Sequence, residues 1–101
     1  MSSLLSEREA LYQRIERACM CLFDTWCETR SVAPLTYLLH CWPLADGSAR
    51  AIRRMRDTLR ELQGSHPDSL APSAAATLAT LICYLDEALV EGSVAEQKAG
   101  R

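Results

Sequence analysis

Five cysteines and two histidines are the side chains of this sequence best suited to metal binding or nucleophilic chemistry. The cysteines stand at positions 19, 21, 27, 41 and 83, and the histidines at 40 and 66. Cys19 and Cys21 lie about 200° apart around a helix, so they cannot ligate one metal together. A site built from Cys27, His40 and Cys41 is conceivable, but no ligand spacing such as Cys-x-x-Cys indicates it. We therefore expect buried, inert cysteines and no metal or other cofactor.

The remaining polar residues do not form a recognisable catalytic pattern. A cysteine or serine nucleophile needs a neighbouring histidine and an orienting carboxylate. Neither histidine lies in a glycine-rich or strand-to-helix context, and Asp86 and Glu87 point to different sides of a helix. No glycine loop of the phosphate-binding kind is present. The sequence thus predicts a protein that is not an enzyme.

Composition restricts the cellular setting and the class of partner. The odd number of cysteines and the lack of a signal-peptide pattern favour the reducing cytoplasm. Uninterrupted apolar runs are far shorter than the ~20 residues that span a bilayer, so no membrane span is expected. The net charge of -2 over 101 residues argues against a protein that coats nucleic acid.

Hydrophobic spacing predicts an all-α fold with three main helices and a short helical corner. The main helices are expected at about 4–29, 49–63 and 73–91, and the corner at about 34–41. They would form a single helical domain over residues 1–92, followed by a disordered tail at 93–101.

Turn-forming residues suggest where these helices begin and end. Pro34 suits the first turn of the corner, and Pro43 is expected to end it. Candidate caps are Ser3 or Ser6 (with Glu9) for the first helix, Asp46 or Ser48 for the second and Pro72 or Ser73 for the third, with Gly64 and Gly92 as stops.

The first predicted helix contains an apolar belt, six consecutive apolar residues at 18–23. They occupy every direction around a helix, so a core on one side cannot hide them all. This helix would be roughly 39 Å long, against about 24 and 27 Å for the other two, and would overhang them. We expect the corner to cover part of the overhang by burying Leu38, Leu39 and Trp42. A second copy would cover the rest, in a symmetric homodimer.

The second main helix combines an inner apolar seam with an arginine-rich surface. Its apolar residues Ile52, Met55, Leu59 and Leu62 are spaced as in a coiled coil. Five arginines between 50 and 60 outnumber two carboxylates. Asp86, Glu87 and Glu91 crowd the end of the last helix, and we expect them to pair with these arginines or with a partner.

Aromatic residues and arginines together are typical of protein interfaces. Leu22 and the 15–22 side of the first helix are predicted to be internal. The residues predicted to contact a partner or a second copy are Tyr12, Cys19, Phe23, Trp26, Arg53, Arg56 and Arg60. An alternative is a DNA-binding or nucleoid-associated module that uses the arginines of segment 50–60.

The layout of the chain resembles one family of regulatory proteins. A long helix with an apolar belt (Leu11, Ile15, Leu22, Phe23, Trp26), an arginine-rich second helix and a reduced, cysteine-containing core resemble the small helical anti-activators of bacterial quorum sensing. Those proteins bind LuxR-type transcription regulators. The resemblance implies a protein that captures a regulator through an apolar helical face and blocks it by competition.

Overall fold

The computed structural model describes residues 7–44 and 48–99, with side chains described as far as residue 90. Within these segments the elements are α1 (Glu7–Glu28), α2 (Val32–Cys41), α3 (Ala49–Ser65), a 3-10 turn η2 (Pro67–Ser69) and α4 (Pro72–Ala99). Neither segment contains a strand. The predicted all-α class is therefore confirmed, and the predicted corner is present as helix α2.

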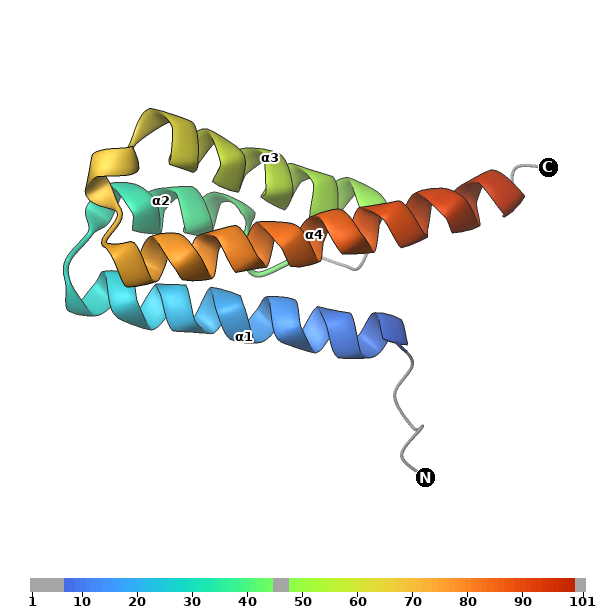
Figure 1. The fold of residues 1–101 in the computed structure, drawn as a ribbon, viewed down its shortest axis with the longest axis horizontal. Helices are drawn as coiled ribbons and strands as arrows, with labels where there is room; N and C mark the ends of the chain where they lie inside the picture. The colour runs from blue at the N-terminus through green and yellow to red at the C-terminus, as the bar shows by residue number, and fades with distance from the viewer. Residues whose placement is uncertain (1–6, 45–47, 100–101) are drawn as a thin grey trace, which may run out of the picture.

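The four α-helices run alternately up and down the molecule (Figure 1). Each packs against two others: α1 and α3 both contact α2 and α4. Short connections favour this antiparallel order. The predicted corner thus acts as a fourth, shorter helix of the bundle, with ten residues against seventeen in α3.

One apolar stripe from each helix forms the core. The α3 seam predicted from spacing is confirmed, since its four apolar residues are 0–1% exposed. The stripe of α4 includes Leu78, Leu81 and Leu85, which are fully buried. The stripe of α1 repeats every three or four residues and consists of Leu11, Ile15, Cys19, Leu22 and Trp26.

The longest helix is α4, and not the first helix as predicted. It has 28 residues against 22 in α1, or about 42 Å against about 33 Å. Its last turns project beyond the other three helices (Figure 1). The predicted overhang of the first helix is therefore wrong, and the homodimer that it suggested stays a prediction without this support.

Burial of the apolar belt is divided among several directions. Cys19 and Leu22 face the core, Ala18 and Phe23 pack at its edge, and Met20 is 47% exposed. The predicted internal position of Leu22 is confirmed. The belt is largely accommodated within one chain because α2 supplies α1 with a second helical neighbour besides α4.

Helix ends follow the predictions in part. Ser48 caps α3 by accepting a hydrogen bond from the backbone N–H of Ala51 at 3.2 Å, and α4 begins at Pro72 as expected. The stop at Gly64 is wrong: α3 continues to Ser65 and ends before Pro67, whose ring disfavours helical backbone at His66. Ser3, Ser6 and Asp46 lie outside the described residues.

The predicted stop at Gly92 is also wrong, because α4 continues through segment 93–99, which was expected to be disordered. A single glycine costs a helix only about 1 kcal/mol relative to alanine. Alanine, glutamate, glutamine and lysine after it are good helix formers.

A left-handed residue ends α1. Arg30 has φ 56°. Its N–H donates to the carbonyl of Cys27 at 3.3 Å, and the N–H of Ser31 donates to the carbonyl of Trp26 at 2.8 Å. These two bonds form a Schellman motif, in which glycine is the usual residue at the left-handed position.

Replacing Arg30 with glycine is expected to raise the free energy of unfolding by about 0.5–1 kcal/mol, because glycine adopts positive φ without steric cost. Urea unfolding followed by circular dichroism measures the change. Arg30→Ala is the control, since it removes the side chain but keeps the cost of positive φ. Equal stabilities of the two variants would contradict this account of the turn.

Candidate functional site

Two of the predicted interface residues on α1 are core residues. Cys19 is 0% exposed and Trp26 is 1% exposed within the single chain. The prediction that they contact another chain is therefore wrong. Both belong to the inner stripe that begins at Leu11 and Ile15.

Trp26 also carries an unpaired polar atom. Its indole Nε1 is buried and has no hydrogen-bond partner among the described residues. A buried donor without a partner costs a folded protein about 1–3 kcal/mol. The large ring must therefore contribute through packing alone.

The other two predicted α1 residues, Tyr12 and Phe23, are half-buried at the edge of the core. The ring of Phe23 lies against that of Trp42, with centroids 5.8 Å apart and planes tilted by 49°. The indole Nε1 of Trp42 donates to Oε1 of Glu16 at 3.3 Å. These contacts hold the segment after α2 against α1.

Leu39 departs from its predicted role. Leu38 is fully buried, but Leu39 is 49% exposed on the surface of α2. The helix ends at Cys41, and Trp42 has extended backbone as expected before Pro43. Because α2 is covered by α1 and α3 on its inner side only, Leu39 is left at the surface.

Two of the three predicted interface arginines form ion pairs within the chain. Asp86 of α4 accepts from Arg60 at 2.9 Å and from Arg56 at 3.4 Å. Arg56 also pairs with Asp57 at 3.0 Å. The expectation that Asp86 pairs with arginines of segment 50–60 is confirmed. The third, Arg53, is exposed on α3.

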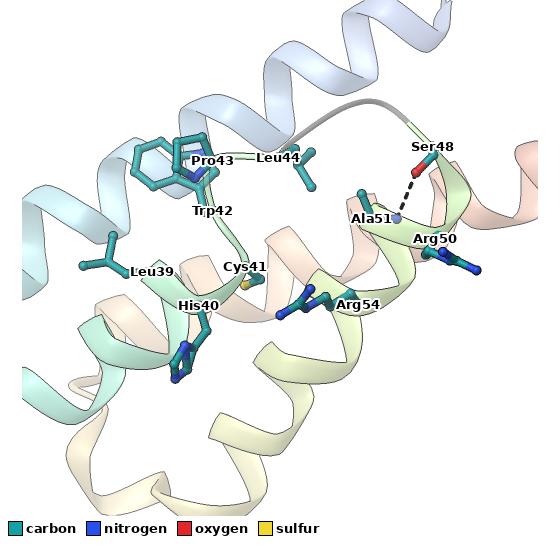
Figure 2. Close-up of a pocket in the computed structure, with 10 residues that line it drawn as sticks. All are labelled: Leu39, His40, Cys41, Trp42, Pro43, Leu44, Ser48, Arg50, Ala51 and Arg54. Atoms are coloured by element: carbon teal, nitrogen blue, oxygen red, sulfur yellow. Dashed lines mark hydrogen bonds between the residues drawn. The ribbon is translucent and has the colours of Figure 1, made fainter.

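A hollow of about 490 Å³ lies where α2 ends and α3 begins (Figure 2). Its walls come from the end of α2, the segment that follows it and the first two turns of α3. They consist of Leu39, His40, Cys41, Trp42, Pro43, Leu44, Ser48, Arg50, Ala51 and Arg54. In Figure 2 the side chain of Arg54 reaches toward Cys41, while His40 points away from Trp42.

The hollow combines an apolar wall with positive charge. Arg50 and Arg54 are exposed, and neither forms an ion pair with a described residue. None of the lining residues within 7–44 and 48–99 is a carboxylate. Such a surface suits an anionic ligand that also carries apolar groups.

Cys41, in the wall of the hollow, is a poor nucleophile. Its thiol donates to the backbone carbonyls of Leu38 at 3.4 Å and Tyr37 at 3.5 Å. Burial raises the pKa of Cys41 to about 11, although the positive charge of Arg54 acts in the opposite direction. Only the thiolate attacks, so this thiol is inactive at neutral pH.

The metal site conceivable from Cys27, His40 and Cys41 is not assembled. Cys27 is exposed on α1, and among the described residues no three histidine, cysteine or acidic side chains are placed to hold a metal ion. The arrangement offers a binding surface and no set of converging ligands.

Segment Pro72–Val90 of α4 has the length and composition to cross a membrane, with a mean hydropathy of 1.4 over 19 residues. Those two properties alone are weak evidence, because core helices of soluble proteins share them. Its leucines 78, 81 and 85 lie in the core, and its exposed positions before Glu87 are small or uncharged side chains. The cytoplasmic location stays a prediction.

Sequence reasoning missed the hollow. The sequence alone shows Arg50 and Arg54 only as part of a charged helix surface, and it predicts Leu39 in the core. The available signal was the combination of a proline that ends a short helix and a serine cap that starts the next one. Together they place the end of one helix beside the start of the next, antiparallel one.

Replacing Trp26 with alanine is expected to lower the free energy of unfolding by about 3–5 kcal/mol, because it leaves a large cavity in the core. Trp26→Phe should cost less, since it keeps most of the ring and removes the unpaired Nε1–H. Phe23→Ala, at a half-buried position, is the matched control in urea unfolding. A larger loss for Phe23→Ala than for Trp26→Ala would contradict the assignment of Trp26 to the core.

Thiol labelling of the folded chain should separate the five cysteines. Cys21, Cys27 and Cys83 are exposed and should react at neutral pH, whereas buried Cys19 should react only after unfolding. Labelling of Cys41 should rise as the pH approaches about 11, because its raised pKa keeps the thiolate fraction low below that value. Peptide mass spectrometry identifies the labelled sites, and Cys41 reacting as fast as Cys83 at neutral pH would contradict this order.

The chain matches no family model, no curated protein and no solved structure with which it was compared. Function is therefore argued from the residues of the chain itself. The resemblance to quorum-sensing anti-activators stays a prediction.

Proposed function

We propose that this chain is a non-enzymatic protein-binding module, an inhibitor or anti-activator that captures a regulatory protein. The binding face is the Trp42 surface, which we define as Met20, Phe23, Leu39, Trp42 and Pro43. The observation that carries the proposal is the exposure of large apolar side chains around a fixed aromatic pair. Met20 is 47% exposed and Leu39 is 49% exposed, beside the tilted pair of rings of Phe23 and Trp42.

Helical spacing makes these residues one surface. Met20 lies one turn from both Glu16 and Phe23 on α1, and Trp42 contacts both of those neighbours. Leu39 lies three residues before Trp42, next to the hollow. The apolar area therefore extends across the seam between α1 and α2.

The chemistry of this surface is that of a binding hot spot. Aromatic residues held rigidly lose little side-chain entropy on binding, and arginines at the rim supply directional contacts. Arg50 and Arg54 stand at one edge of the Trp42 surface. A partner that covers it would bury apolar area and be positioned by the charges.

The anti-activator form of this proposal follows from the resemblance to proteins that bind LuxR-type regulators. In that form, this chain uses its Trp42 surface to cover the part of the regulator through which the regulator dimerises or works. Inhibition then needs no chemical step. The degree of inhibition depends only on the concentration of this chain relative to the dissociation constant of the complex.

A second candidate function is DNA binding through α3. It is favoured by three exposed arginines, Arg50, Arg53 and Arg54, without ion pairs to described residues. Asp57 and Glu61 interrupt the positive surface. DNA binding would fall steeply with salt, and the absence of a gel shift at low salt would remove this candidate.

Leu39→Glu is expected to abolish capture of the partner, because it places a charge in the middle of the apolar surface. Val32→Glu is the matched control: it is on the same helix, 71% exposed, and at the N-terminal end where an acidic side chain is favourable. Both variants should keep the circular dichroism spectrum of the parent chain.

The measurement is co-purification of tagged chains from the native cell, followed by mass spectrometry. A protein retained by the parent and by Val32→Glu but lost with Leu39→Glu supports the proposal. A protein retained equally by all three chains would show that binding uses another surface.

A further inference from the structure

We propose that the hollow beside Trp42 binds an acidic, apolar segment of the captured protein, with carboxylates of that segment bound by Arg50 and Arg54. This inference rests on the proposed function and specifies the chemistry of the partner.

The first argument is the distribution of charge along α3. Its five arginines divide into two groups, because Asp86 binds Arg56 and Arg60 toward the end of the helix. No corresponding carboxylate of the described residues pairs with Arg50 or Arg54. Two guanidinium groups therefore remain available for carboxylates from outside the chain.

The carboxylates nearest to this hollow among the described residues have other positions or partners. Asp57, three residues after Arg54, pairs with Arg56. Glu16 lies on α1 and accepts the indole N–H of Trp42. Glu61 lies about two turns along α3 from Arg54 and shares a second hollow with it, but no ion pair joins the two side chains. The described residues that line the hollow around Arg50 include no acidic side chain.

The second argument is the apolar wall opposite these charges. Leu39, Trp42, Pro43 and Leu44 line the same hollow as the two arginines. An inorganic anion or a phosphate backbone would leave this wall in contact with water. A segment that carries both carboxylates and large apolar side chains would satisfy both sides, which is why we assign a protein segment and not a nucleic acid.

The third argument is geometric. Arg50 and Arg54 are four residues apart on one helix, or about 6 Å along its axis, and so lie on the same face. The shorter α2 ends at Cys41, beside Arg54, and α3 extends past that end toward Arg50 (Figure 2). A segment lying along this part of α3 meets both arginines in succession.

The size of the surface also favours a protein segment over a small molecule. The hollow holds about 490 Å³, but the exposed apolar area continues outside it to Met20 and Phe23. A small ligand would fill the hollow and leave that area uncovered. A segment of several residues can place an apolar side chain in the hollow and continue across the seam.

The test is selection of short random-sequence peptides, displayed on phage, against the full chain. The expected result is enrichment of peptides with at least two acidic residues together with leucine or aromatic residues. Synthetic peptides from the selection are then measured by fluorescence anisotropy at low and high ionic strength. Their affinity should fall as salt rises, because both carboxylate contacts are near solvent.

Charge-reversal variants locate the contact. Arg50→Glu combined with Arg54→Glu should weaken the selected peptides by about tenfold or more, as expected for lost and reversed charge pairs. Arg53→Glu is the matched control, because it is exposed on α3 but does not line the hollow. Peptides with lysine in place of their acidic residues should bind the double variant better than the parent chain.

The outcomes separate this inference from the proposed function. Selected peptides that lack acidic residues, yet lose binding with Leu39→Glu, would overturn the inference and leave the proposed function standing. Peptides unaffected by Leu39→Glu and by the arginine variants would contradict both. A selection that enriches no sequence, or a double arginine variant that binds as well as the parent chain, would also overturn the inference.

Discussion

Burial of the α4 apolar stripe between α1 and α3 is the interaction on which the rest of the structure depends. Leu78, Leu81 and Leu85 are fully enclosed there, and no charged residue occurs in α4 before Asp86. Once α4 is placed, α1 and α3 lie on either side of it, and the remaining apolar sides of those two helices need cover. The short α2 supplies it by inserting Pro34 and Leu38.

The length of α2 then determines where the surface is incomplete. Ten residues cover only part of a seam between helices of 22 and 17 residues. Trp42 and the residues after it extend that cover along α1, but they do not close the space beside the start of α3. The candidate site thus arises from an ordinary packing constraint, the mismatch in helix lengths, and requires no strained or specialised backbone.

Sequence periodicity predicted the fold class and much of the core because spacing alone specifies one face of α3. Apart from the small residues Ala49 and Ala51, the apolar residues of that helix are separated by charged or polar ones, so only one orientation buries them. In the apolar belt of α1 the same reasoning fails. The residues from Ala18 to Phe23 are apolar in every direction around the helix. Cys19 is buried more deeply than Ala18 only because of where α2 and α4 lie.

The candidate site was harder to predict for a related reason. The sequence shows five similar arginines on one helix, and nothing local distinguishes Arg54 from Arg60. Their roles separate only when the fold brings Asp86 within 2.9 Å of Arg60 and 3.4 Å of Arg56. Likewise, Leu39 and Leu38 are adjacent leucines, and only the positions of the neighbouring helices decide that Leu38 is buried and Leu39 exposed.

The position of Asp86 also makes the distribution of charge along α3 uneven. By neutralising the later part of α3, it leaves the positive charge of that helix concentrated at its first turns, where the peptide dipoles add a further positive potential. The chain as a whole carries a net charge of -2, so the remainder of its surface is more acidic than this end. An acidic macromolecule that diffuses toward the protein is therefore attracted more strongly to this end of α3 than to its other end. Such steering acts before any contact forms, so the speed and angle of the first encounter depend on a carboxylate that lies outside the hollow.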